Sequence, residues 1–437
     1  MKTVSSIALP GTLDPGFGED GIVNLPFPDV PGFHVTDVLA LPDKKVMVCL
    51  LREGNSNEYL MCRLHENGDF DESFAQGLGF AEITFRPGCA IHYFLAFKSL
   101  DESGWLMSAR YYSDSQAGRV LVRQRLDGQL DANFGEGGIR YIPQSEYLVD
   151  TKRSATALSA PSVQEESAHF NASSPIIRQM DGKIILVDFV FSEVDVTKSV
   201  VIRLNADASL DKSFNEKGFV LVEPTGISYD TIEAMGVAVQ NDGKVLISGR
   251  YTRGELGNEN AFITRYGADG KIDETFNAGE PVSIAERSSL GSISVCESDG
   301  RIVAVGSWGN LDHGLIVVLN PNGSNNLDFN NGQPLVTDLA VHGHTWSKQS
   351  TGTDGAITVY GFGGANFGQN LTSVTARYRA DGSLDQTFNG KGFNLYSGTG
   401  ESQYLRGVSI MPDERIVIGG AAPEAGGGTG WVLRYLA

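Results

Sequence analysis

A short motif recurs along the whole chain and constrains its fold more than any other feature. The motif reads Gly-x-Leu-Asp-x-x-Phe, as in residues 11–17, and a further Gly usually follows within a few residues. Its Phe returns at a period of about 60 residues, which is the spacing of a repeat architecture. The seven positions are Phe17, Phe74, Phe134, Phe214, Phe276, Phe329 and Phe388, and the copy ending at Phe329 has Asn325 and Asn326 in place of Leu and Asp.

Each copy is accompanied by a hairpin signal and by apolar strands. Asp-Gly pairs such as residues 181–182 and 242–243 precede apolar runs, and both residues of such a pair can take the positive φ of a tight hairpin. Another strand ends near an Arg-Tyr pair such as 265–266, and the motif then leads into a fourth strand. Four short strands per repeat predict an all-β, seven-bladed β-propeller of four-stranded antiparallel blades. A linear solenoid is the competing interpretation, but it needs polar capping repeats that neither end of the sequence resembles.

The two ends of the sequence complete each other. Residues 430–435 look like a third strand without a following Leu-Asp turn, and residues 13–23 look like the missing turn and fourth strand. We therefore expect residues 1–437 to form a single propeller domain, in which 400–437 and 1–28 form the split closing blade. N-terminal strand pairing with the C-terminal blade would close the ring and leave no exposed sheet edge.

The repeated side chains have expected structural roles. The Phe is expected to fill the space between blades, and the Asp is expected to accept turn N–H groups. A metal-binding role for these Asp residues is the minor alternative. Four cysteines are too few for a disulfide framework, and Cys49, Cys62 and Cys296 lie in apolar runs. We expect small buried residues, with a Cys49–Cys62 bridge as the alternative, and no zinc site because no CxxC spacing occurs.

The signature Asp-Gly-x-Leu-Asp-x-x-Phe-x-x-x-Gly and its period resemble the delta-60 repeat family, a group of bacterial β-propeller repeats of uncharacterised function. The resemblance covers nearly the whole chain. It implies the propeller fold and names no catalytic residue. Members are often secreted or at the cell surface, whereas the first residues here show no signal peptide. The localisation is therefore unknown, either cytoplasmic or exported by a non-classical route.

The composition limits the classes of partner that the chain is expected to bind. Lys and Arg number 34 against 53 Asp and Glu, a net charge of −19, and so acidic a chain repels nucleic-acid phosphates. No apolar run reaches the ~20 residues of a membrane-spanning helix. The remaining partners are a small molecule, a glycan or a protein, and the sequence does not indicate an oligomeric state.

Propeller geometry divides the connecting loops between two faces. The Asp-Gly and Leu-Asp turns share one face and repeat from blade to blade, so they are expected to be scaffold. The loops entering first strands and those joining second to third strands share the other face, vary in sequence, and are where binding usually occurs. The insertion at 144–174, in the third blade, is long enough to be functional and is expected on this variable face, over the mouth of the central channel or a neighbouring blade.

Aromatic, Arg and His residues gather in the variable segments, a combination that carbohydrate or peptide recognition uses. His34, His92 and His344 lie at first strands, which line the central channel, so they could converge as a metal or acid–base site. Separate solvated or core-edge histidines are the alternative. The predicted ligand-binding residues are His34, His92, Tyr93, Arg110, Tyr112, Tyr251, Trp308, Trp346, Tyr404 and Arg406.

Two function classes follow. A binding scaffold for a carbohydrate or a protein or peptide on the variable face is favoured, because no Gly-x-Ser-x-Gly, phosphate-loop or His-Glu-x-x-His motif occurs. The alternative is a hydrolase or lyase with a His and carboxylate site at the channel mouth, with or without a divalent metal. No cofactor is otherwise expected. The acids nearest the channel entries by sequence are Asp230, Glu233, Glu286 and Glu401.

Overall fold

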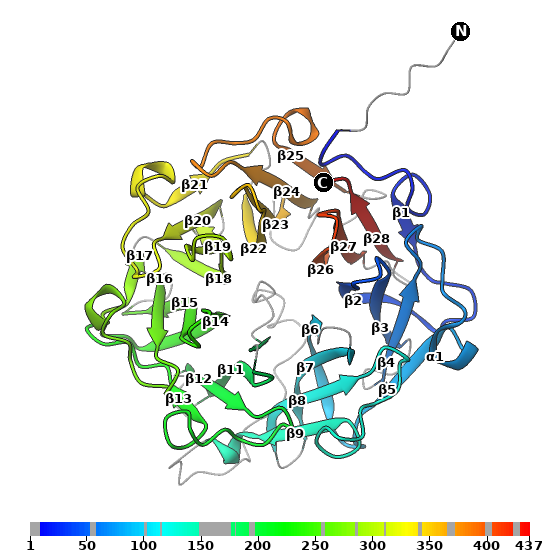
Figure 1. The fold of residues 1–437 in the computed structure, drawn as a ribbon, viewed down its shortest axis with the longest axis horizontal. Coiled ribbons are helices and arrows are strands. Elements are labelled where there is room, and N and C mark those ends of the chain that lie inside the picture. Colours follow the sequence, from blue (N-terminus) through cyan, green and yellow to red (C-terminus); the bar gives the residue numbers. More distant parts are fainter. Residues whose placement is uncertain are drawn as a thin grey trace. The chain divides into compact units, whose positions relative to one another are not determined.

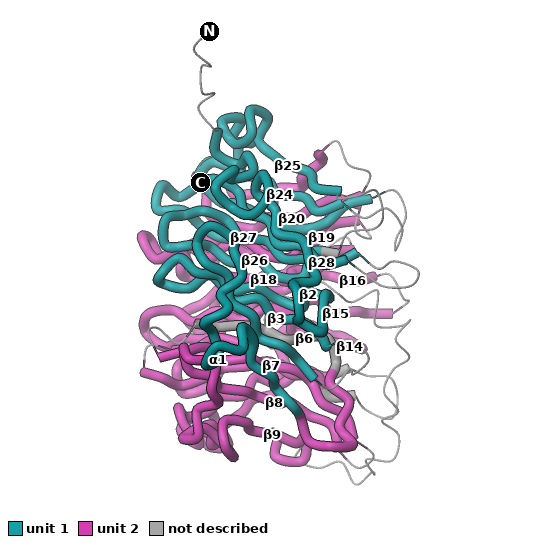
Figure 2. Tube along the Cα trace, turned by 90° about the vertical axis from the view of Figure 1, so that its right-hand side faces the viewer, with its two compact units in different colours: residues 1–84, 350–437 teal, residues 85–349 magenta. Residues whose placement is uncertain are grey.

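Seven four-stranded antiparallel sheets make up the structure, a computed structural model of the chain (Figure 1). The predicted seven-bladed β-propeller is therefore confirmed, with sequence-adjacent strands paired in every blade except the seventh, where the first strand of the chain pairs with the last. The residues that the structure describes are 9–52, 58–99, 103–113, 116–147, 176–179, 181–191, 197–254, 258–284, 287–309, 312–339, 343–364, 372–397, 404–422 and 429–437. The chain divides into two compact units, residues 1–84 with 350–437 and residues 85–349 (Figure 2).

The first unit contains blade one, blade seven and most of blade six. Its short α1 (Phe74–Gly77) and η7 (Phe388–Gly390) are single turns within Leu-Asp-x-x-Phe connections. The strands are β2 (Gly32–Ala40), β3 (Val46–Arg52), β4 (Glu58–Leu64) and β5 (Phe80–Thr84) of blade one; β23 (Ile357–Gly363), β24 (Thr372–Tyr378) and β25 (Phe393–Tyr396) of blade six; and β26 (Tyr404–Ile410), β27 (Ile416–Ala422), β28 (Thr429–Tyr435) and β1 (Ile22–Asn24) of blade seven.

The second unit contains blades two to five, and its boundary falls within β22 (His344–Thr351), the first strand of blade six. Its single helical turns are η2 (Gln144–Glu146), η5 (Asn277–Gly279) and η6 (Asn330–Gly332). The strands are β6 (Ala90–Ser99), β7 (Trp105–Tyr112), β8 (Ala117–Gln124) and β9 (Ile139–Pro143) of blade two; β10 (Ile176–Arg178), β11 (Ile184–Phe191), β12 (Thr197–Leu204) and β13 (Phe219–Leu221) of blade three; β14 (Thr231–Val239), β15 (Val245–Thr252), β16 (Glu259–Tyr266) and β17 (Val282–Ile284) of blade four; and β18 (Ser288–Val295), β19 (Ile302–Trp308), β20 (His313–Leu319) and β21 (Leu335–Thr337) of blade five.

Blade seven joins the two ends of the chain, as predicted. β1 pairs antiparallel with β28, from Ile22 opposite Leu433 to Asn24 opposite Trp431. Asp14, just before β1, accepts hydrogen bonds from Arg434 Nε at 2.8 Å and from Arg415 Nη1 at 3.2 Å. The N-terminal segment is therefore held by strand pairing and by two ion pairs.

An Arg-Asp-Phe cluster explains the repeated motif. In blade four, Asp273 Oδ1 accepts the N–H of Thr275 at 2.9 Å, which confirms the predicted turn acceptor. Its Oδ2 accepts from Arg265 Nε at 2.8 Å, and the same guanidinium lies 4.8 Å from the centroid of the Phe276 ring. Arg265 Nη1 also donates to the carbonyl of Pro321 in blade five, so this cluster links neighbouring blades.

Four other blades carry the same Arg-Asp-Phe cluster, and in blade five Val318 and Asn326 replace its Arg and Asp. Every repeated Phe is buried, which confirms the expected filling role. Phe276 packs so closely on Gly323, at φ +86°, that a Cβ there would lie 2.8 Å from the aromatic ring. The four equivalent clusters are Arg63, Asp71 and Phe74; Arg123, Asp131 and Phe134; Arg203, Asp211 and Phe214; and Arg434, Asp14 and Phe17.

The structure also bears on the predictions for the cysteines, for membrane-spanning helices and for the insertion. Cys49, Cys62, Cys89 and Cys296 are all buried and free, so the expectation of small buried residues is confirmed and the Cys49–Cys62 bridge was wrong. Within the described residues, no helix has the length and apolar character needed to cross a bilayer. Most of the predicted 144–174 insertion lies outside the described residues, so its placement stays a prediction.

Candidate functional site

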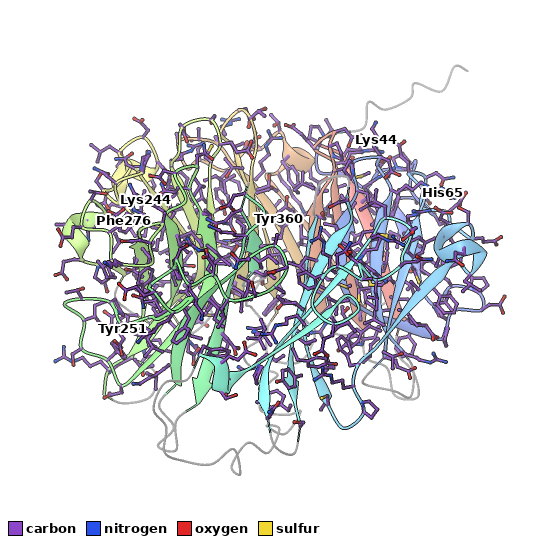
Figure 3. All side chains as sticks on the ribbon, turned by 60° about the horizontal axis from the view of Figure 1, so that its bottom comes forward. Lys44, His65, Lys244, Tyr251, Phe276 and Tyr360 are labelled. Carbon is purple, nitrogen blue, oxygen red and sulfur yellow. The ribbon has the colours of Figure 1, made fainter. Side chains whose placement is uncertain are left out.

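The sheet of blade four has the repeated turns at one end and the variable connections at the other. Figure 3 shows Tyr251 at one end of the sheet and Lys244 and Phe276 at the other. Lys244 follows the Asp-Gly hairpin, and Phe276 closes the Leu-Asp turn. The end that carries Tyr251 is therefore the variable end of this blade.

A row of charged side chains crosses three adjacent strands at the variable end. Arg250 of β15 donates from Nε to Glu233 Oε2 of β14 at 2.8 Å, and from Nη1 to Glu259 Oε1 of β16 at 3.3 Å. The three side chains keep 17%, 25% and 30% of their surface exposed, respectively. Burial alone would lower the pKa of Arg250, but the carboxylates of Glu233 and Glu259 raise it above its usual value. The guanidinium therefore stays charged between two carboxylates that solvent can reach.

Tyr251 and Asp230 extend this row. The hydroxyls of Tyr251 and Ser283 form a 2.8 Å hydrogen bond, and the partly exposed Tyr251 ring lies 6.5 Å from that of Phe262. Asp230 Oδ2 accepts the N–H of Gly254 at 2.7 Å and so fixes the turn after β15. We call Asp230, Glu233, Arg250, Tyr251 and Glu259 the blade-four row. It combines donors, acceptors and an aromatic face on a rigid sheet.

Two other predicted ligand contacts are buried in blade two. Arg110 and Tyr112 are 4% and 6% exposed, and the Arg110 guanidinium lies 5.5 Å from the Tyr112 ring centroid. Arg110 donates from Nη2 to the carbonyl of Phe189 in blade three at 3.1 Å. Arg110 therefore joins two blades, and both side chains present almost no surface.

Trp346 is also enclosed. Its Nε1 donates to the Thr337 hydroxyl at 2.9 Å, and its ring packs edge-on against His344 with centroids 5.0 Å apart. His344 Nε2 lies 2.9 Å from the same hydroxyl. Burial lowers the pKa of His344 to about 4, with a smaller contribution from His313. The predicted stacking surface of Trp346 thus faces the interior, and Trp308 is half-buried against the core of blades four and five.

His34 and Arg406 come together in the first unit. They lie on β2 and β26, and burial, followed by the charge of Arg406, lowers the pKa of His34 to about 4. The side chains of His92, Tyr93 and Tyr404 lie outside those that the structure describes, as do Glu286 and Glu401. Where side chains are described, no three or more His, Cys, Asp or Glu residues form a potential metal site. Because His92 is not among them, the three-His hypothesis stays a prediction.

Sequence reasoning missed the partners of several of these residues. Glu259, Arg119 and Asp188 were not singled out, although they contact Arg250 or lie beside Arg110. A charged residue inside an otherwise apolar strand, as in Val187-Asp188-Phe189, is the signal that would have found the buried pair.

The comparisons with known proteins support the repeat assignment. A family model described as a domain of unknown function (DUF5122) β-propeller matches residues 179–214, 240–276 and 353–388. No curated protein matches the chain.

Three similar solved structures have TM-scores between 0.46 and 0.48. A protein of unknown function from Dyadobacter fermentans has a TM-score of 0.47 and 12% identity, covering 80% of this chain and 100% of that one. A puromycin-hydrolysing peptidase from Mycobacterium tuberculosis gives 0.48 and 13%, covering 98% of this chain, which spans about half (54%) of the peptidase. The polysaccharide lyase Uly1 gives 0.46 and 12%, covering 94% and 92%. Similarity at this level does not extend to function. The matches of the DUF5122 β-propeller model confirm the resemblance to the delta-60 repeats in these three segments, and the function of that family is uncharacterised.

Proposed function

We propose that the protein is a binding scaffold that recognises a neutral carbohydrate at the blade-four row. The observation that carries this proposal is the row itself, where Glu233, Arg250 and Glu259 are held by mutual hydrogen bonds on three strands and remain partly exposed. Sugar hydroxyls both donate and accept hydrogen bonds, so carboxylates beside a guanidinium suit them. The Tyr251 ring supplies the flat apolar face that a pyranose packs against.

Charge argues for a neutral ligand. The row contains three carboxylates, from Asp230, Glu233 and Glu259, against one guanidinium. The whole chain carries a net charge of −19, which adds a repulsive field for any acidic ligand. A row fixed by its own hydrogen bonds also loses little conformational entropy on binding, which favours a preformed recognition surface.

A neutral-glycan array followed by calorimetric titration of the strongest hit tests this proposal. Tyr251→Ala should weaken binding by about tenfold or more, because it removes the stacking face, while Tyr251→Phe should retain most of the affinity. Glu274→Gln is the matched control, since Glu274 is exposed on the same blade in the Leu-Asp turn.

Two results would contradict the proposal. One is a wild-type protein that binds no neutral glycan. The other is a glycan whose affinity is the same in the Tyr251→Ala and Glu274→Gln variants, because the binding would then lie away from the row. A peptide that competes at the same residues would replace the carbohydrate as ligand class.

A further inference from the structure

The degenerate copy of the repeated motif, in blade five, differs from the other copies in charge. Residues 320–337, which we call the blade-five rim, include the motif turn and β21, and they contain one charged side chain, Asp328. The equivalent stretches of blades two, three and four, residues 125–142, 205–222 and 267–284, contain five each. β21 is the last strand of its sheet (Figure 1), and sheet edges are usually protected by charged side chains. The blade-five rim lacks that protection.

Neutral amides hold the turn of this rim together. Asn326 occupies the position of the motif Asp, and its Oδ1 accepts the N–H of Asp328 at 3.1 Å. Its Nδ2 donates to Asn320 Oδ1 at 3.0 Å. Phe329 at the end of the turn is buried, as in the other copies. The turn therefore forms without the motif carboxylate, and the lack of charge affects mainly the surface that the rim presents.

Apolar side chains are exposed on the same rim. Leu327 is 76% exposed, the highest value among the described large apolar residues, and Val336 of β21 is 39% exposed. Blades three and four carry Lys212 and Glu274 at the position of Leu327. Exposed apolar side chains in a surface depleted of charge indicate a protein interaction site.

We propose that the blade-five rim is a contact surface for a second copy of this chain, related to the first by a twofold axis. In a twofold contact each surface meets its own copy, so a charged group meets its own like charge. Amides and hydroxyls both donate and accept hydrogen bonds, so they can pair with their own copies. Apart from Asp328, the exposed polar residues of the rim are all of this kind: Asn322, Ser324, Asn325, Asn331 and Gln333.

The charge of the whole chain also favours contact through this rim. Two copies that each carry a net charge of −19 repel each other, and the repulsion is smallest where the approaching surfaces hold few charges. Nine residues of the rim are exposed, fewer than the ~20–30 per partner of a standard interface, so the contact is a weak one. The rim shares no residue with the blade-four row, so this inference does not rest on the proposed function.

Sedimentation velocity of the full-length protein, from about 1 to 300 μM and at about 0.02 and 0.3 M salt, tests this contact. We expect a monomer–dimer equilibrium whose dissociation constant falls by about threefold or more at the higher salt, because salt screens the repulsion between two acidic chains. Leu327→Asp should weaken the dimer by about tenfold or more, since it removes an apolar contact and adds like charges across the twofold axis.

Leu78→Asp is the matched control, because Leu78 is 71% exposed in the corresponding connection of blade one and the substitution adds the same charge. This variant should dimerise like the wild type. Asn322→Asp should weaken the dimer without removing apolar surface. It places in blade five the residue that blade four has as Asp269, so the test stays decisive if Leu327→Asp does not fold.

Four results would overturn the proposal. The wild-type protein could remain monomeric up to about 300 μM, a concentration at which a weak contact is populated. Leu327→Asp and Leu78→Asp could weaken the dimer equally, which would place the contact elsewhere. Higher salt could weaken the dimer, which would indicate ion pairs, or the assembly could keep growing with concentration, which a closed twofold contact does not allow. Tyr251→Ala should dimerise like the wild type, which separates a failure here from a failure of the glycan proposal.

Discussion

Replacing Arg265 with Ala removes the guanidinium that links blade four to blade five. Arg265 and Asp273 form a 2.8 Å ion pair in which the side chains are 4% and 8% exposed. The guanidinium also donates to Thr275 Oγ1 at 3.0 Å and to Gln240 Oε1 at 2.8 Å. The variant would leave the buried Asp273 carboxylate with Lys244 as its remaining cation, whose Nζ lies 3.6 Å away on a side chain that is 30% exposed.

The expected cost follows from burial. Removing one partner of a buried ion pair costs about 3–5 kcal/mol, because the remaining charge stays desolvated, and Lys244 beside Asp273 places the expected loss at the lower end of that range, about 3 kcal/mol. Arg377 occupies the same position in blade six, but its side chain is 23% exposed and its Nε lies 3.5 Å from Asp385 Oδ2. Arg379 also lies 3.4 Å from Asp385, so this carboxylate keeps a cation when Arg377 is removed. Arg377→Ala should therefore cost about 1 kcal/mol or less.

Urea unfolding at 25 °C, followed by far-UV circular dichroism, measures both variants against the wild type. Both variants remove the Arg at the same motif position, and Arg265 is the more buried of the two and the closer to its Asp. A loss of less than about 1 kcal/mol for Arg265→Ala, or equal losses for the two variants, would refute the argument that burial sets the strength of the cluster.

Three further predictions concern stability and accessibility. Folding lowers the pKa values of His34 and His344 from 6.5 to about 4. As the pH drops from 6.5 toward 4, the unfolded chain therefore binds protons at these residues before the folded protein does, and the free energy of unfolding should fall. A double variant, His34→Gln with His344→Gln, whose urea midpoint declines as steeply as that of the wild type would contradict this. In the same urea assay, Gly323→Ala should lower the free energy of unfolding by about 2–3 kcal/mol, because it combines a positive φ with a Cβ 2.8 Å from Phe276. Gly254→Ala should lower it by about 1 kcal/mol, because that residue also has a positive φ but its Cβ would meet no atom within 4 Å. All four cysteines are buried and free, so a thiol reagent should titrate four thiols in denaturant and essentially none in the native protein, and rapid native labelling would count against the core packing.

The motif residues show how far sequence reasoning reached into the fold. The Asp and Phe roles could be predicted because they are local: an Asp two residues before a turn N–H forms its hydrogen bond wherever the turn occurs, as Asp273 does with Thr275. For the Arg of the cluster, the sequence indicated only its position at the end of a strand and none of its contacts. Its contact with the Pro321 carbonyl depends on which residues the next blade brings alongside.

The candidate site was less predictable for the same reason. Tyr251 is partly exposed beside Arg250, whereas Trp346 and Arg110, chosen by the same criteria, are buried. Trp346 lies against Gly314 and Thr337 of blade five, and at Gly314 the absence of a Cβ leaves room for the indole. Exposure of an aromatic or Arg side chain is therefore set by the size of side chains on the adjacent blade, which a residue's own segment does not specify.

The sequence by itself determined the number of blades, the strands within each and the pairing of the two chain ends, because these follow from local turn chemistry repeated at a fixed period. Only the tertiary structure decided which polar side chains reach solvent and which become buried. Packing between blades encloses Arg110, Arg119 and Asp188 and leaves Glu233, Arg250 and Glu259 accessible. Burial is a property of neighbouring surfaces in space, so it is fixed only when the blades pack against one another.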